Sequence, residues 1–318
     1  MKTVVFMGTP QFAVPILESL IDSPDYQVLA VVTQPDRRVG RKHRLTASPV
    51  KQTAQQHQIR VLQPEKINHS PEMAEIIEMR PDFMITAAFG QFLPTKLLDA
   101  TQIAAINVHA SLLPKYRGGA PVHYAVINGD PETGVTIMYM VKKMDAGDII
   151  AQKKMPITKQ DDTGSMFDKL SLLGRDLLME TLPHLVAGDV HPIAQDPDKV
   201  TFSPNISSDQ ERIDYHLTAD RIDDKVRGLR PFPIANMVLD GTRTKIYDVT
   251  PLAEKTDLKP GQVVRVEKHA LVLAAGDGTT YQINKLKPAG KQLMDITAYL
   301  NGHQNLKEGF QAVTDDKH

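Results

Sequence analysis

Three polar residues, Asn107, His109 and Asp145, have the types and positions expected of a catalytic site. The apolar run 103–106 predicts a buried strand that continues into these residues. Since side chains alternate along a strand, Asn107 and His109 are expected on one face and Val108 on the other. Asp145 lies in a glycine-bearing turn between two apolar stretches, where a fold can bring a distant carboxylate beside a histidine.

These side chains suit the attack of an amine on a carbonyl group such as a formyl, in which the carbonyl oxygen becomes negative. Asn107 can donate to that oxygen without carrying a charge, and His109 can donate to it or move a proton. Asp145 can orient the histidine and favour its cation, or take a proton from the attacking ammonium. The alternative is structural, with Asn107 capping a turn, His109 a hydrogen-bonded core histidine and Asp145 an ordinary loop residue.

The composition indicates a soluble globular protein with two domains. The chain has 318 residues, of which 41% are hydrophobic and 24% charged, and its net charge is -1. Its apolar runs are too short to cross a bilayer, and the N-terminus is expected to begin with a strand instead of a signal peptide. The absence of cysteine excludes disulfides, thiolate zinc sites and cysteine nucleophiles, and it suits the cytoplasm. The low net charge means that a nucleic acid would have to be held by a local patch.

Short apolar strands alternate with helices over the first half of the chain. This alternation predicts an α/β fold, with a mainly parallel, doubly wound sheet that binds ligands at the carboxyl ends of its strands. The expected strands are 3–7, 28–33, 60–62, 83–87, 103–108, 135–141 and 149–155, and the expected helices are 12–21, 49–58, 71–78, 121–128 and 164–186.

The second half has a different texture. Residues 190–206 are rich in Pro and Asp and lack periodicity, which predicts a linker between domains at 1–189 and 207–318. Residues 207–230 look helical. The short strands that follow predict a small β-barrel of the oligonucleotide-binding (OB) kind. These strands are 236–239, 244–249, 261–267, 270–274 and 281–287.

A basic loop follows the second expected strand. Five cations within residues 34–44 suit contact with a nucleic-acid backbone, although a solvated charge run is the usual explanation of such a segment. The cations are Arg37, Arg38, Arg41, Lys42 and Arg44.

Two further segments bear on the ligand. Phe89 and Gly90, after the expected strand 83–87, could wall a flat aromatic ligand, or they could be loop packing. Residues 8–10 lack the glycine spacing of a dinucleotide fingerprint, and Pro10 removes an amide that could bind phosphate, so a nicotinamide enzyme is disfavoured. The histidines show no metal-ligand spacing, and no metal is predicted.

Four segments, residues 107–114, 117–121, 133–138 and 144–148, resemble the signatures of the formyltransferases that use 10-formyltetrahydrofolate. The resemblance spans nearly the whole chain. It implies a Rossmann-like catalytic domain followed by an OB-like barrel that contacts tRNA. It also implies that Asn107, His109 and Asp145 are catalytic, that no metal takes part, and that the folate is held by Ser111, Leu112, Leu113 and Pro114.

Segments 8–10, 34–51 and 228–233 resemble the family members that act on initiator methionyl-tRNA. This resemblance implies formyl transfer to the α-amine of the methionine for translation initiation, with Arg41 directed at the acceptor end of the tRNA. No membrane and no obligate protein partner are predicted. From Ser207 onward there are 16 Lys and Arg against 16 Asp and Glu, so tRNA contact there must depend on where charges lie.

Two other kinds of function are compatible with parts of this pattern. A related folate enzyme could formylate a sugar nucleotide or glycinamide ribonucleotide, or hydrolyse the formyl folate, but it would have less use for the basic loop and the second domain. A catalytically silent RNA-binding protein would leave the three polar residues without work. Assay with formyl folate and charged initiator tRNA separates these possibilities.

Overall fold

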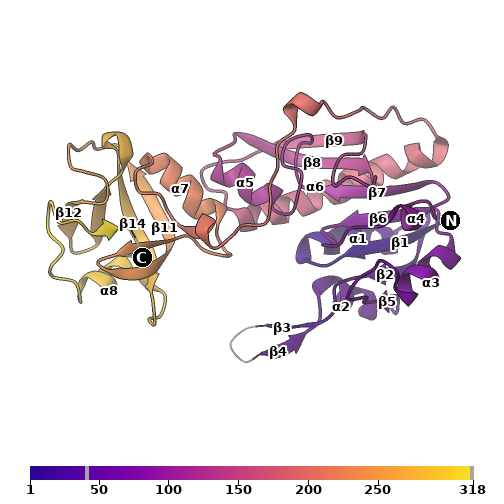
Figure 1. Cartoon of the computed structure of the whole chain (residues 1–318), viewed down its shortest axis with the longest axis horizontal. Coiled ribbons are helices and arrows are strands. Elements are labelled where there is room, and N and C mark those ends of the chain that lie inside the picture. Colours follow the sequence, from indigo (N-terminus) through magenta and orange to yellow (C-terminus); the bar gives the residue numbers. More distant parts are fainter. Residues whose placement is uncertain (40–42, 316–318) are drawn as a thin grey trace. The chain divides into compact units, whose positions relative to one another are not determined.

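The computed structural model describes residues 1–39 and 43–315, which form two compact units (Figure 1). Each unit is assembled from three stretches of chain. The domain limits predicted from the sequence, at 189 and 207, stay a prediction. Unit 1 comprises Met1–Pro121, Glu132–Pro156 and Phe167–Pro204, and unit 2 comprises Val122–Pro131, Ile157–Met166 and Asn205–His318.

Unit 1 is built on a seven-stranded sheet with the order β5-β2-β1-β6-β7-β8-β9. Strands β5, β2, β1, β6 and β7 are parallel, while β8 and β9 pair antiparallel, so the predicted mainly parallel, Rossmann-like sheet is confirmed. The order reverses beside β1, where such sheets bind ligands. The strands are β1 (Lys2–Gly8), β2 (Tyr26–Val32), β5 (Arg60–Leu62), β6 (Phe83–Ala87), β7 (Ala104–His109), β8 (Glu132–Tyr139) and β9 (Ile149–Pro156).

The helices of this region begin at recognisable caps. Ser48 and Ser70 accept hydrogen bonds from backbone amides of the first turns of α2 and α3, and a proline occupies the first helical position of each. No helix within the described ranges has the length and apolar character that a membrane span requires. The helices are α1 (Val14–Asp22), α2 (Pro49–Gln56), α3 (Pro71–Met79), α4 (Thr95–Leu98) and α6 (Thr163–Ala187).

The alternation of β7 decides which of its faces carries the candidate polar side chains. A Cβ added to Gly174 of α6 would lie 2.9 Å from Val108 Cγ1, so this helix passes close to one face of the strand. Ala105 packs on the other face, in a core cluster with Met84 and Met7. Asn107 and His109 share the face of Ala105, as the sequence predicted.

The basic loop is a β-hairpin at both of its described ends. Strands β3 (Arg37–Val39) and β4 (Arg44–Thr46) pair antiparallel, with Arg37 opposite Thr46. Residues 40–42 lie outside the described residues.

Unit 2 contains an antiparallel sheet with the order β12-β13-β14-β11-β10-β16. Its two edges meet at a bridge between Gln262 and Gln311, which supports the predicted small barrel in the form of a curled half-barrel. The elements are α5 (Pro121–Ile127), α7 (Ala219–Gly228), β10 (Asn236–Leu239), β11 (Thr242–Leu252), β12 (Val263–Glu267), β13 (Ala270–Ala274), β14 (Thr280–Pro288), β15 (Met294–Asp295), α8 (Ile296–Leu300) and β16 (Val313–Thr314).

The helix predicted over residues 207–230 is wrong in its first half. Only α7 is helical in the α sense, and a single 3-10 turn precedes it at Asp209–Glu211. Ile213 and Tyr215 are buried while Asp214 is exposed, which is the period of an extended chain. Ile213 N–H also donates to the carbonyl of Asn236, so tertiary pairing overrides the helical composition.

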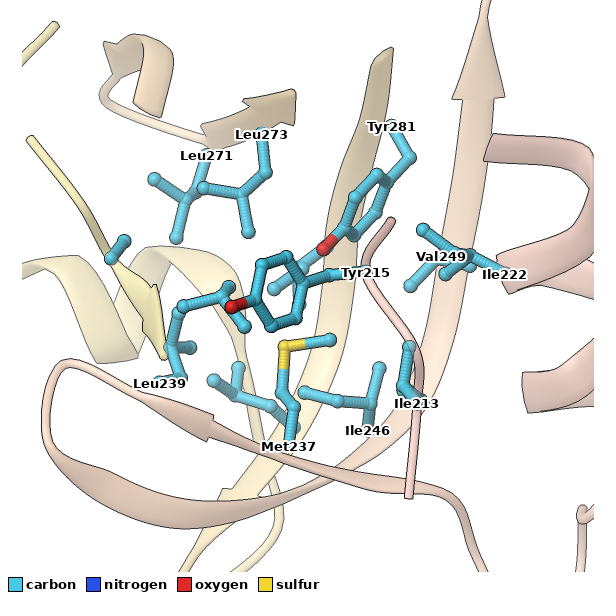
Figure 2. Close-up of a cluster of buried hydrophobic side chains, with 14 of the residues drawn as sticks. Ile213, Tyr215, Ile222, Met237, Leu239, Ile246, Val249, Leu271, Leu273 and Tyr281 are labelled. Carbon is cyan, nitrogen blue, oxygen red and sulfur yellow. The ribbon is translucent and has the colours of Figure 1, made fainter. Parts of the chain in front are cut away.

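Two tyrosines lie among the aliphatic side chains of the core of unit 2 (Figure 2). Tyr281 is fully buried beside Tyr215, Val249 and Ile222. Within the described ranges the Tyr281 hydroxyl has no hydrogen-bond partner. Burial raises the pKa of Tyr281 well above its usual range because the phenolate cannot be solvated there.

We expect Tyr281→Phe to raise the free energy of unfolding by about 1 kcal/mol, because an unsatisfied buried hydroxyl is removed while the ring stays. Tyr281 stays protonated in the folded chain, so its contribution is complete below the unfolded pKa of about 10 and is lost as pH rises above it. The variant should therefore also lose less stability than the parent above that pH. Urea unfolding at neutral and alkaline pH measures both effects.

Tyr281→Leu is the control, because loss of the ring should lower the free energy of unfolding by about 3 kcal/mol. Equal destabilisation by Phe and Leu would show that the hydroxyl has a stabilising partner.

Candidate functional site

Asn107 lies at the end of β7, and a threonine on the neighbouring strand fixes its amide. Thr86 of β6 is the register partner of Asn107, and its hydroxyl donates to Asn107 Oδ1 at 2.7 Å. Thr86 is itself buried. Because the amide oxygen is taken, the two N–H donors of Asn107 are left for a ligand.

His109 is 6% exposed and sits between a backbone carbonyl and a carboxylate. Its Nε2 lies 3.0 Å from the carbonyl oxygen of Tyr116, and its Nδ1 lies 3.8 Å from Asp145 Oδ2. A carbonyl oxygen can only accept, so Nε2 must carry a proton in this arrangement. A second proton on Nδ1 would turn the contact with Asp145 into an ion pair.

The Asp145 carboxylate is held by a backbone N–H, and its own backbone lies in a left-handed turn. Its Oδ2 accepts a hydrogen bond from Gly118 N–H at 2.8 Å, and its own φ of 48° is left-handed. The turn needs glycine at position 147, since a Cβ there would collide with the carbonyl of Tyr139. Within the described ranges no three His, Cys, Asp or Glu side chains gather as a metal site would require.

The structure thus brings the predicted trio together at the carboxyl end of β7. Asn107 supplies uncharged hydrogen-bond donors. His109 and Asp145 face each other, and each can take up or release a proton. The arrangement can stabilise negative charge on a carbonyl oxygen and accept a proton.

Hydrogen bonds with buried hydroxyl groups hold the segment that is predicted to bind the folate. Ser111 is fully buried and its hydroxyl donates to the carbonyl of Lys115, so this side chain shapes the loop. Thr136 on β8 donates to the carbonyl of Ser111 and accepts from Leu113 N–H. Leu112 and Pro114 are half-buried, which leaves their side chains accessible to a ligand.

Phe89 and Gly90 follow β6 at the same edge of the sheet. Phe89 is 4% exposed and packs in the core, so its ring does not form an open wall for a ligand. The Phe89 carbonyl accepts from Thr9 Oγ1 and from Gln34 Nε2, both at 3.1 Å. Gly90 is exposed at φ +86°, which leaves open backbone beside the site.

The hairpin cations have mixed surroundings. Arg37 pairs with Glu65 at 2.8 Å, and Arg38 donates to the carbonyl of His43. Arg44 is exposed. The two remaining cations of the predicted set, Arg41 and Lys42, lie outside the described residues.

An acidic residue anchors the start of the hairpin. Asp36 accepts hydrogen bonds from Lys51 Nζ at 2.9 and 2.8 Å and from Gln63 Nε2 at 2.8 Å. These hydrogen bonds hold the pKa of the Asp36 carboxyl below its usual range.

Sequence reasoning missed the residues that support the trio. Thr86 and Thr136 are isolated hydroxyls on buried strands, where a polar side chain without charge gives little signal. Arg117 and Gln195 bond each other, and Gln195 lies in the stretch predicted to be a linker. A buried polar residue inside an apolar strand is the one cue that could have found Thr86.

Comparison with known proteins identifies the family. A profile described as formyl transferase matches residues 1–182, and one described as the formyl transferase C-terminal domain matches residues 205–304. A protein of Limosilactobacillus fermentum named methionyl-tRNA formyltransferase is 74% identical over 316 residues, or 99% of this chain and 100% of the relative. One of the same name from Enterococcus faecalis is 59% identical, with 97% and 98% covered. The chain belongs to the formyl transferase family.

Solved structures show the same fold at much lower identity. The N-formyltransferase of Helicobacter canadensis, solved with folinic acid and dTDP-3-aminofucose, has a TM-score of 0.68 and 20% identity, with 89% of this chain and 99% of that one covered. HypX of Aquifex aeolicus, solved with tetrahydrofolic acid, has a TM-score of 0.63 and 17% identity, with 95% and 47% covered. The family resemblance and the fold predicted from the sequence are therefore confirmed.

We expect Thr86→Val to lower the formyl-transfer rate of this formyl transferase by about tenfold, since Asn107 would lose the hydrogen bond that orients its donors. Thr86→Ser is the matched control, because it keeps the hydroxyl and should stay within about threefold of the parent. Steady-state kcat of the two variants is the measurement. Equal rates for Val and Ser would show that Asn107 is oriented by something else.

Proposed function

We propose that this enzyme transfers the formyl group of 10-formyltetrahydrofolate to the α-amine of methionine on initiator methionyl-tRNA, in the cytoplasm, for translation initiation. The observation that carries the proposal is the trio Asn107, His109 and Asp145 at the edge of a Rossmann-like sheet. The chain is also similar over its full length to relatives named methionyl-tRNA formyltransferase. Folate compounds in the fold neighbours support a tetrahydrofolate-derived donor.

The residues present fit such a donor. The formyl folate would lie along the exposed backbone at Gly90 and the half-buried Leu112 and Pro114, which end at the trio. Ser111, Leu113 and Phe89 are buried, so they support the loops from which the more exposed Gly90, Leu112 and Pro114 would meet the ligand.

The reaction follows from the donors. The free methionine amine attacks the formyl carbon, a new N–C bond forms, and the bond from that carbon to the folate nitrogen breaks. The Asn107 N–H groups donate to the oxygen while it is negative, and the positive charge of the protonated His109 ring stabilises it through space. Before the attack the methionine ammonium loses one proton, which Asp145 takes directly or through water. After the attack the same nitrogen loses a second proton, and one proton passes to the folate nitrogen as its bond to the formyl carbon breaks. Neutral and cationic donors supply the charge stabilisation here, so we assign no metal.

The second domain and the hairpin supply the tRNA side of the proposal. Residues 207–318 form the tRNA-binding barrel, and residues 1–189 the catalytic domain. Arg37, Arg38, Arg41, Lys42 and Arg44 are proposed to meet the acceptor stem. Because Arg37 is paired with Glu65, the exposed Arg44 carries more of this proposal.

The deciding assay gives the purified protein formyl folate and either charged initiator tRNA or elongator methionyl-tRNA. The proposal expects formylation of the initiator in preference to the elongator. A related enzyme would instead formylate an amino-sugar nucleotide, which a third arm supplies because a fold neighbour was solved with such a compound. Formylation of the sugar alone would overturn the tRNA assignment.

We expect Asn107→Ala, His109→Ala and Asp145→Ala each to lower kcat by at least about 100-fold, because each acts on the reacting carbonyl or the proton. Affinity for tRNA should stay near that of the parent. His109→Ala combined with Asp145→Ala should lose far less than the product of the single losses, since the pair acts as one unit. Near-parental kcat in a single variant would remove that residue from the mechanism.

We expect Arg41→Leu to weaken tRNA binding more than Lys42→Leu does, since arginine can fork to a phosphate or a base edge. Each lost phosphate contact should also reduce the slope of log affinity against log salt by about one. Arg41→Lys should recover part of the loss, and folate affinity should not change. Filter binding of initiator tRNA at several salt concentrations measures this, and small equal effects of all variants would mean a solvated charge run.

A further inference from the structure

Gln195 makes four hydrogen bonds that join a buried arginine to the turn of Asp145. Its Oε1 accepts from Arg117 Nε and Nη2 at 3.0 and 2.8 Å. Its Nε2 donates to the carbonyls of Asp145 and Gly147 at 2.9 and 2.7 Å. The guanidinium can only donate and the carbonyls can only accept, so the orientation of the amide is fixed.

Thr201 and Ser203, further along the same segment, contact the loop whose carbonyl faces His109. Ser203 Oγ donates at 3.0 Å to the carbonyl of Tyr116, the group that also faces His109 Nε2. Arg117 N–H donates to the Thr201 carbonyl at 2.9 Å, and Ser203 N–H donates to the Arg117 carbonyl at 2.8 Å.

The backbone at Gly118 packs closely against the backbone at Ser203. A Cβ on Gly118 would lie 2.7 Å from the Ser203 carbonyl oxygen, and Gly118 is the residue whose N–H holds the Asp145 carboxylate. The 195–204 segment therefore contacts the supports of both His109 and Asp145.

We propose that Gln195 and Ser203 are positioning residues for the catalytic pair, Gln195 for Asp145 and Ser203 for His109. Gln195 contacts none of the reacting atoms in the proposed mechanism. It sets the turn from which the carboxylate approaches His109 Nδ1, while Ser203 sets the carbonyl that fixes the proton on Nε2. The inference deepens the proposed function and rests on it for its kinetic test.

The variant Gln195→Glu distinguishes positioning of Asp145 from mere stabilisation of the fold. A glutamate keeps and strengthens the contact with Arg117, so the segment stays anchored. It replaces the Nε2 donor with an oxygen that repels the carbonyls of Asp145 and Gly147. Gln195→Met, which has neither donor nor acceptor, is the second variant.

We expect Gln195→Glu to lower kcat by about tenfold to 100-fold while KM for both substrates changes by less than about threefold. Its melting temperature should stay near that of the parent because the Arg117 contact survives. A melting temperature that falls while kcat holds would show that Gln195 only braces the fold and would overturn the proposal.

Asp196→Ala is the matched control beside it. The Asp196 side chain accepts from Asp198 N–H and pairs with Lys199, all within the same stretch of chain. This variant should disturb the segment locally and leave kcat within about twofold of the parent. A loss as large as that of Gln195→Glu would mean that any change in the segment is harmful and that Gln195 has no special role.

The coupling can be isolated in an Asp145→Ala background. If Gln195 acts through the carboxylate, Gln195→Glu should cause little further loss of kcat once the carboxylate is absent. Independent, multiplicative losses would contradict action through Asp145.

A spectroscopic readout keeps the inference testable apart from turnover. Long-range 1H–15N spectra of the imidazoles report which ring nitrogen of His109 is protonated, and the His109 signals are assigned by their loss in His109→Asn. We expect Gln195→Glu and Ser203→Ala to shift these signals and Asp196→Ala to leave them unmoved. If the parent fails to formylate tRNA but these shifts occur, the proposed function fails and the positioning stands; unmoved signals overturn the positioning.

Discussion

The hydrogen bond from Gly118 N–H to the Asp145 carboxylate is the contact on which the site depends. It joins two loops that are 27 residues apart in sequence and places the carboxylate beside His109. The turn that contains Asp145 and the loop that contains Gly118 are both needed for this geometry. The turn presents the carboxylate, and the loop holds it beside His109 at the end of β7. The sheet supplies the third constraint, since the pairing of β6 with β7 sets Thr86 against Asn107.

The sheet and the position of Asn107 and His109, two of the proposed catalytic side chains, could be predicted from the sequence because both follow from short-range patterns. Alternation over residues 104–109 decides which side chains share a face, and helices that begin at Ser-Pro pairs leave a clear local signal. Asp145 was predicted from a glycine-bearing turn, and its approach to His109 came from the long-range packing that the structure shows. The tRNA-contacting roles of the hairpin stay predictions.

The 195–204 segment could not be found in this way. Two of its hydrogen bonds with Arg117 join backbone to backbone, and such bonds depend little on residue type, so they leave no periodicity. The others use Gln195 and Ser203, two isolated polar side chains that form no pattern in the sequence. A lack of periodicity was interpreted as a linker, although the segment is firmly paired. The same reasoning failed in the opposite direction at 207–218, where helical composition hid an extended stretch that packs Ile213 and Tyr215 into a core.

Charge placement within unit 2 narrows how it could meet a polyanion. Arg227 is buried and pairs with Asp223 and Asp224, and Arg230 pairs with Asp162 and Asp248. The Arg227 pairs are buried, whereas the Arg230 pairs are part-exposed. In both, opposite charges lie close together and neutralise each other, so they contribute little to the field outside. With equal numbers of acids and bases after Ser207, attraction to a tRNA must come from exposed cations whose acidic neighbours are distant. The count of charges in this unit therefore says little about its affinity for nucleic acid, and their burial says more.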